Sequence, residues 1–250
     1  RVIFASPIQL GSSVVVSRWF IKMRGRANGI LTLSHSVGMV GFPLLATLFI
    51  AITNWQTAWL LLGLLVWIIA FIPVCLLIRE RPEDLGLIAD GDDLEPGLNL
   101  DKPSSVLPSQ KKDPIWSVAQ ATSTSVLWIL AISVGALYVM QAGTNIHMGA
   151  YLRDLEFTSA TAGVAIGLNA AFTGIGGISW GWICEKLPVK FSLAGVAVTM
   201  SLAVFLMSTI GEQYEALLYA SLFGFGLGGM LSVPPVAFAD YFGRQSLGSI

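Results

Sequence analysis

Charged residues are scarce in this sequence, and their scarcity excludes an exterior that faces water. Asp, Glu, Lys and Arg make up 12% of the 250 residues, and 54% of the residues are hydrophobic. Soluble domains carry about 25% charged residues. Five long stretches contain no charged side chain: 27–78, 114–152, 157–184, 191–211 and 216–239. No polar face exists to cover a core of this size, so we expect these stretches to lie in lipid.

The lengths of these stretches predict helices that cross a membrane. A spanning helix needs about 20 mostly apolar residues, and runs of this length are too long for barrel strands. The polar segment "TNWQT" at 53–57 divides the longest stretch in two. We therefore predict an all-α, polytopic membrane protein with seven passes, at 1–19, 26–52, 56–78, 122–148, 160–182, 191–210 and 215–239. The first residue is Arg, and the last residues would start an eighth helix, so we expect a fragment.

Positive charge gathers on one predicted side of the membrane. Cytoplasmic loops carry an excess of Lys and Arg. If the chain after the first pass is cytoplasmic, 12 of the 14 Lys and Arg fall on that side, and Arg153 is the only one in an outer loop. The predicted membrane spans on both sides of the basic cluster at 18–26 argue against nucleic acid as its partner. We expect a multi-pass protein of the plasma or inner cell membrane, with the lipid bilayer as its surroundings.

The one long polar stretch divides the predicted passes into two groups. Residues 79–113 are rich in acidic residues, Pro and Ser, a composition that does not build a packed core. We interpret them as a cytoplasmic linker. It would join three passes of an N-terminal half, 1–78, to four passes and the start of a fifth in a C-terminal half, 114–250.

Cysteine is rare, and so are the residue sets that carry catalysis. Cys75 and Cys184 lie near the predicted cytoplasmic ends of different helices, so we expect free thiols in a reducing compartment. Neither has His or Cys at the spacing of metal ligands, so no metal or cofactor is expected. No Asp, Glu, Lys or Arg lies in the middle of a complete pass. An intramembrane enzyme would need such groups, and we therefore predict that the protein is not an enzyme.

A weak internal repeat suggests the architecture. The first pass ends "SRWF" and the seventh ends "ADYF", and basic residues follow each. The two segments are six passes apart, so both helices would cross in the same direction. Two parallel halves related by an axis along the membrane normal form a known transporter plan.

Several segments resemble the major facilitator superfamily. They are "SRWFIKMRGRANGI" at 17–30, "RERPEDLGLIADGD" at 79–92, "NIHMGAYLRDLEFTSATAG" at 145–163, "GWICEKLPVK" at 181–190 and "ADYFGRQSLGSI" at 239–250. The resemblance implies helices four to ten of that fold and the first residues of helix eleven. It leans toward monocarboxylate and oxalate/formate carriers. Oxalate-type relatives often carry an arginine in the second position of Gly176-Gly177-Ile178, and its absence weakens the dicarboxylate reading.

The resemblance also points to residues that could close the cytoplasmic side. The family's loop motif matches Gly181, Glu185, Lys186 and Lys190, with Glu in place of the usual Asp. Arg18 and Asp240 lie at equivalent turns of the two halves and could join charge networks that close an inward gate. The other candidates at these turns are Arg24 and Arg244. The alternative is that these charges only anchor the topology.

Polar residues within the passes are candidates for a solute cavity. His35 lies about ten residues into its pass, near mid-bilayer, beside Ser34. A histidine there could bind an anion or relay a proton, or could simply bond to a neighbouring helix. The remaining cavity candidates are Tyr138, Gln141, Asn145, His147, Asn169 and Thr173. For His147 the alternative is a polar helix end at the interface, and for the last two it is hydrogen bonding between helices.

Glycine-rich segments predict close contact between helices. "GIGGISWG" at 174–181 and "FGFGLGGM" at 223–230 place small residues at spacings of two to four, as in tightly packed membrane helices. No strand precedes them, so they are not phosphate-binding loops. Trp180 and Trp182 are expected at a membrane interface.

These observations together favour a secondary active transporter of a small organic solute. It would work by alternating access, with two halves rocking about a site between them. A monocarboxylate-like anion with proton coupling is the first expectation for the solute, and the full-length protein is expected to act as a monomer. The alternative is a membrane receptor or sensor that binds a small ligand in the same cavity without moving it.

Overall fold

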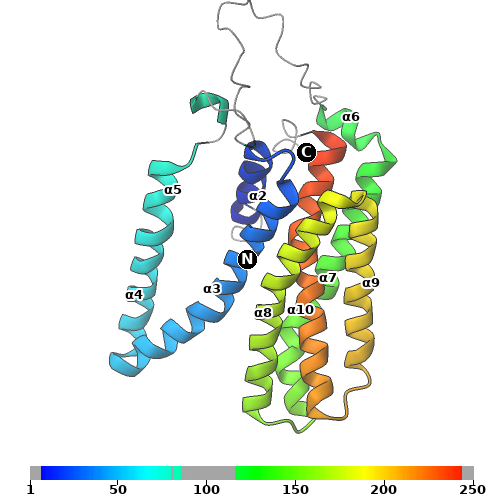
Figure 1. Ribbon diagram of the computed structural model, residues 1–250. Helices are drawn as coiled ribbons and strands as arrows, with labels where there is room; N and C mark the ends of the chain where they lie inside the picture. Colours follow the sequence, from blue (N-terminus) through cyan, green and yellow to red (C-terminus); the bar gives the residue numbers. More distant parts are fainter. Residues whose placement is uncertain (1–6, 80–81, 86–89, 91–115, 244–250) are drawn as a thin grey trace, which may run out of the picture.

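The computed structural model describes residues 7–79, 82–85, 90 and 116–243, and within these ranges every regular element is a helix (Figure 1). Six helical segments there are long and apolar enough to span a bilayer. They are α3 (Arg24–Ile52), the rod formed by α4 (Trp55–Val66) and α5 (Ile72–Leu77), α7 (Ser125–Asp154), α8 (Ser159–Lys186), α9 (Val189–Met207) and α10 (Gln213–Phe242). The predicted all-α, polytopic fold is confirmed. Of the predicted first pass, the structure describes α2 (Pro7–Trp19), and residues 1–6 lie outside the described ranges.

Polar residues at the predicted breaks cap these helices. Asn54, within "TNWQT", accepts a hydrogen bond from the backbone of Thr57 at 2.9 Å and so starts α4 just after α3 ends. Thr158 caps α8 in the same way. Caps of this kind satisfy backbone donors that the first helical turn leaves unpaired. They explain why apolar stretches that hydropathy alone cannot divide become separate helices.

The helices form two groups that meet at one end of the molecule (Figure 1). The first group is α2 to α5, and the second is α7 to α10. We call the end where α5 finishes and α7 begins the linker end. A short helix there, α6 (Val118–Thr122), leads into α7. Within the second group α8 packs along α10, and α9 packs on the other side of α10. The rod of α4 and α5 stands apart from the second group.

Glycines bring the backbones of α8 and α10 into contact. A Cβ atom on Gly176 would overlap the backbone of Phe225, and one on Gly228 would overlap the backbone of Thr173. Gly224 is just as close to the backbone of Asn169. The predicted role of the two glycine-rich segments in close helix packing is therefore confirmed.

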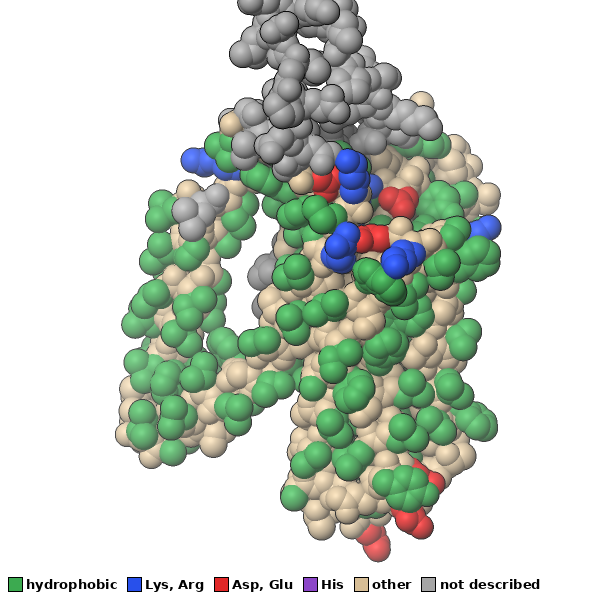
Figure 2. Space-filling view, in the orientation of Figure 1, with side chains coloured by type: hydrophobic (Ala, Val, Ile, Leu, Met, Phe, Trp, Pro, Cys, Tyr) green, Lys and Arg blue, Asp and Glu red, His purple; other side chains and the backbone are tan. Residues whose placement is uncertain are grey.

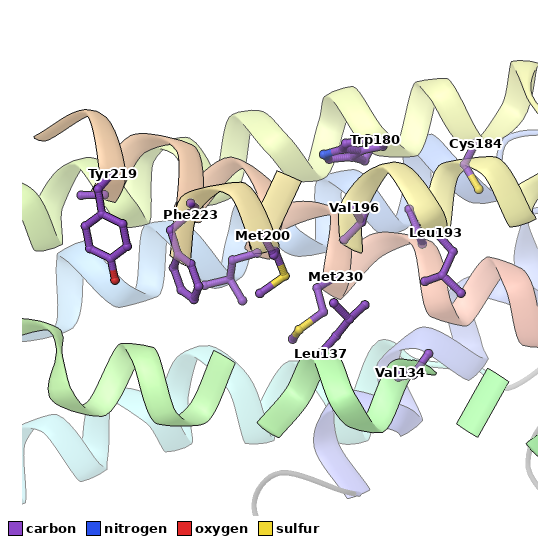
Figure 3. Close-up of a cluster of buried hydrophobic side chains, with 14 of the residues drawn as sticks. Val134, Leu137, Trp180, Cys184, Leu193, Val196, Met200, Tyr219, Phe223 and Met230 are labelled. Atoms are coloured by element: carbon purple, nitrogen blue, oxygen red, sulfur yellow. The ribbon is translucent and has the colours of Figure 1, made fainter. Parts of the chain in front are cut away.

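The apolar core of the second group surrounds this contact (Figure 3). Met200 and Val196 of α9 point toward Met230 and Phe223 of α10, and Leu137 of α7 closes the other side. All five side chains are buried. Lipid supplies no hydrophobic driving force between helices, so dispersion contacts such as these hold the group together.

Trp180 is part of this core, and its expected position at a membrane interface is wrong. Its side chain is only 8% exposed, and its ring fills space left by Gly195 and Gly229. Trp182, two residues later, is 49% exposed and remains compatible with an interfacial position. Because α8 is apolar on every side, hydropathy does not reveal which of its faces meets protein.

Gly176→Ala tests the contact between α8 and α10. The added methyl group would force the two backbones apart, and overpacking of this kind costs about 1–3 kcal/mol. We expect the apparent melting temperature of the purified protein in detergent to fall by about 2–12 °C. Gly167→Ala on the same helix is the control, because a Cβ there meets nothing within 4 Å. Equal melting temperatures for the two variants would contradict the packing described here.

Candidate functional site

The first and second helix groups are joined by a crossing of α3 and α8 near the linker end. A Cβ on Gly29 would lie 2.7 Å from the carbonyl oxygen of Gly177. A Cβ on either Gly25 or Gly181 would overlap the carbonyl of the other residue. The glycines are four residues apart on each helix, which places them on one face. The two helices therefore come into backbone contact at these glycines, in the small-residue arrangement of membrane helices.

The two helices separate beyond this crossing. Gly174 of α8 still lies against Leu33 and Ser36 of α3. Farther along α3, a Cβ on Gly38 or Gly41 would meet nothing within 4 Å, and the same holds for Gly163 and Gly167 on α8. Figure 2 shows the resulting gap, which widens toward the end opposite the linker. The groups are thus in contact at one end and apart at the other.

A carboxylate of α8 binds the first turn of α3. Glu185 accepts hydrogen bonds from the backbone N–H of Arg26 at 2.9 Å and from its Nε at 2.7 Å. Arg26 lies in the first turn of α3, where unpaired N–H groups and the helix dipole favour a negative charge. One carboxylate therefore caps the partner helix and pairs with its guanidinium.

A second ion pair joins α3 to α10. Nη1 of Arg24 lies 3.3 Å from Oδ1 of Asp240, and its Nε donates to the carbonyl of Phe20 at 3.0 Å. The Arg24 side chain is 8% exposed, whereas that of Asp240 is 47% exposed. Figure 2 shows charged side chains of both signs close together in this region. We call the glycine crossing and these two ion pairs the linker-end closure.

The structure brings Arg24 together with Asp240, and it places two further residues proposed for gating, Gly181 and Glu185, against the start of α3. Among the described contacts, Asp240 pairs with Arg24. Lys186 stands over the ring of Trp182 at 3.7 Å, and Lys190 lies 5.0 Å from the ring of Phe191. Arg244 lies outside the described residues. That these residues form a gate stays a prediction.

Arg26 is a residue that the sequence reasoning missed. It belongs to the basic cluster that was interpreted as an anchor, yet it makes the shortest ion pair of the closure. The acidic residue of the loop motif, Glu185, could have indicated that a basic partner was needed. Which basic residue pairs with Glu185 depends on the crossing angle of α3 and α8, and no local sequence pattern encodes that angle.

His35 lies on α3 beyond the closure. It is eleven residues after Arg24 and four after Leu31, so it shares the face of α3 that carries Arg24 toward α10. At 1.5 Å per residue this is about 16 Å farther into the membrane. The His35 side chain is exposed, and the hydroxyl of Ser34 donates to the carbonyl of Leu31 within its own helix. His35 is therefore placed where the two groups begin to separate.

The other cavity candidates occupy two different surroundings. On α7, Tyr138 and His147 are exposed, and Gln141 and Asn145 are half-buried. On α8, Asn169 and Thr173 are buried against α10. The amide of Asn169 donates to the carbonyl of Ala220 of α10 at 3.4 Å, and the hydroxyl of Thr173 donates to the carbonyl of Asn169 at 2.7 Å. A role in solute binding stays a prediction for all of them.

An apolar groove of about 590 Å³ lies elsewhere, between α7 and α9. Its walls are mostly Leu, Ile, Val and Ala, with Lys190 and Tyr241 among the few polar residues. None of the cavity candidates lines it. Solute sites need convergent polar groups in an apolar wall, so the groove carries no functional assignment.

Both cysteines are free thiols, as expected. Cys75 is exposed, whereas Cys184 is only 8% exposed and lies close to Asp240 and Glu185. Cys184 belongs to the apolar core of the second group, one residue before Glu185. We expect its alkylation rate, in a Cys75→Ala background, to rise when the linker-end closure opens.

Arg26→Ala and Glu185→Gln should each open the closure more often. A partly exposed ion pair contributes about 1 kcal/mol, so we expect Cys184 alkylation in nanodiscs to accelerate about fivefold. Arg153→Ala is the control, because its guanidinium bonds only within α7, at the opposite end, among the described contacts. Rates that stay unchanged in both variants would show that the pair does not hold the closure.

Comparison with known proteins agrees with this geometry. A family model described as "Major Facilitator Superfamily" matches residues 2–250. A protein described as an "MFS-type transporter" from Gibberella moniliformis (strain M3125 / FGSC 7600) is 26% identical over 243 residues. That alignment covers 94% of this chain and 51% of the relative, so the chain spans about half the length of the curated relative it matches. The match over nearly every residue, on a polytopic bundle of helices, shows that the chain belongs to the Major Facilitator Superfamily.

Proposed function

We propose that this transporter carries a small organic solute by alternating access, as a secondary active carrier and not as an enzyme. One observation carries the proposal. The two helix groups are held together at the linker end and are apart at the other end. A protein in this arrangement can expose a site between its groups to one side of the membrane at a time.

The strength of the linker-end closure suits a contact that must break in each cycle. In each ion pair one side chain is 8% or 12% exposed and the other is about half exposed. Pairs of this kind contribute about 1 kcal/mol each. The glycine crossing adds dispersion contacts, among them those of Thr32 with Gly177 and of Leu33 with Gly174. Binding of a solute could therefore shift the balance between closed and open states with a modest difference in affinity.

The distribution of positive charge supports a cytoplasmic linker end. Of the Lys and Arg residues that the structure describes, all except Arg153 lie there, and positive charge marks the cytoplasmic side. On this basis the structure corresponds to a carrier that faces outward. The plasma or inner cell membrane is the proposed location.

His35 is the proposed contact for the solute. It lies just beyond the closure, on the face of α3 that carries Arg24. A protonated imidazole can hold a small carboxylate, and loss of its proton would release it. This chemistry supports a monocarboxylate-like anion with proton coupling.

The crossing itself argues against a dicarboxylate. Oxalate-type relatives often carry an arginine at the position of Gly177. Here a Cβ on Gly177 would lie 2.6 Å from side-chain atoms of Thr32. The closed crossing leaves no room for a long side chain at this position. Gly177 itself supplies no positive charge to bind a second carboxylate. A monovalent anion or a neutral solute fits better.

Solute accumulation separates a carrier from a receptor. The intact protein is reconstituted in vesicles under an inward proton gradient, with labelled lactate and acetate as probes. We expect uptake above that of empty vesicles and loss of uptake when the gradient is dissipated. Saturable binding of a probe without accumulation would favour the receptor.

His35→Ala should abolish proton-coupled uptake in the intact protein. We expect at least a tenfold loss of initial rate, because a charged hydrogen-bond partner of a carboxylate contributes about 1.5–3 kcal/mol. Thr47→Ala is the matched control, since its exposed hydroxyl bonds only to the carbonyl of Pro43 within α3 among the described contacts. Unchanged uptake and unchanged pH dependence in His35→Ala would remove His35 from the mechanism.

A further inference from the structure

The linker reaches back to the turn between α2 and α3. Both carboxylate oxygens of Asp90 accept backbone hydrogen bonds from this turn, from Ile21 at 2.9 Å and from Lys22 at 2.8 Å. Just after the rod of α4 and α5 ends, the carbonyl of Arg79 accepts a hydrogen bond from the indole N–H of Trp19 at 3.0 Å. Two points of the linker segment are therefore attached to the same short connection.

Asp90 suits this position in both backbone and side chain. Its φ angle is 67°, in the left-handed region that Asp and Asn tolerate better than most residues. Its charged side chain makes stronger hydrogen bonds to N–H groups than a neutral acceptor would. An alanine here would lose the contact and strain the backbone as well.

The turn held by Asp90 is the base of the linker-end closure. It is followed directly by Arg24, the first residue of α3, and the carbonyl of Phe20 in the turn accepts from the Arg24 side chain. Met23, at the helix N-cap, makes no side-chain capping bond. Asp90 supplies two bonds to this turn from outside α3.

We propose that Asp90 is a positioning residue for the linker-end closure. By fixing the turn at residues 20–23, it sets the start of α3 so that Arg24, whose side chain bonds to the turn, reaches Asp240. The proposal rests on the proposed function, because it assumes that the closure opens and re-forms. It gives the linker a direct part in the balance between the open and closed states.

A purely structural role for Asp90 predicts a different pattern. If its bonds only stabilise the fold, their loss adds to the effect of any other destabilising change. If Asp90 acts through Arg24, removing Asp90 matters only while the Arg24 pair exists. Double-mutant cycles distinguish these cases.

The test uses the alkylation rate of Cys184 with a maleimide, in a Cys75→Ala background and in nanodiscs. Asp90→Gly keeps the backbone conformation accessible and removes both bonds. Asp90→Asn keeps one acceptor oxygen and removes the charge. We expect the rate to rise about tenfold in the first variant and about threefold in the second. Asp154→Asn, an exposed carboxylate at the other end of α7, should leave it unchanged.

The decisive comparison adds Arg24→Ala. Positioning predicts that Asp90→Gly accelerates alkylation in the wild-type background and adds less than twofold once Arg24 is removed. Equal effects in both backgrounds, or no effect in either, would overturn the proposal. If the Gly variant does not fold to a monodisperse protein, the same cycle with Asp90→Asn decides.

This readout needs no solute, so it separates the proposal from transport. Vesicles that accumulate no probe, together with a coupled response of Cys184, would refute the carrier and keep Asp90 as a positioning residue of a receptor. Normal accumulation with an unresponsive Cys184 would refute the positioning role and leave the carrier standing.

Discussion

The arrangement of this protein depends on how closely α8 approaches its two neighbours. Gly177 and Gly181 touch the backbone of α3 or its side chains, and Gly176 touches the backbone of α10. Side chains at these positions would separate the helices by several ångströms. The carboxylates of Glu185 and Asp240 would then no longer reach α3. Backbone contact is thus the condition for both ion pairs.

Glycine contacts of this kind hold two membrane helices together. In lipid, helices associate through dispersion and interhelical hydrogen bonds, because the tails around them are equally apolar. Asn169 adds such a bond between α8 and α10, inside the second group. Between the groups, α3 and α8 meet through glycine backbones and a partly exposed ion pair. The same helix therefore contacts α10 inside its own group and α3 of the other group, in both cases through glycine.

The extent of each helix could be predicted well from the sequence, whereas the faces of the helices could not. Predicted pass 26–52 became α3, Arg24–Ile52, and predicted pass 160–182 became α8, Ser159–Lys186. Charges and polar caps stand at helix ends, where local composition reveals them. Trp180 was misplaced because α8 is apolar all round, and a pattern without a polar side does not say which side meets protein. Arg26 was missed for a related reason, since its partner lies 159 residues away.

The sequence by itself determined the membrane spans, the accumulation of positive charge at one end and the membership of the family. These properties follow from hydropathy and short motifs, which act over one or two helical turns. Only the tertiary structure decided that Arg24 meets Asp240 across 216 positions, that Asn169 bonds to α10, and that Asp90 holds the turn before α3. Such pairings depend on crossing angles and on which backbone atoms come into reach, and these quantities exist only once the helices have packed.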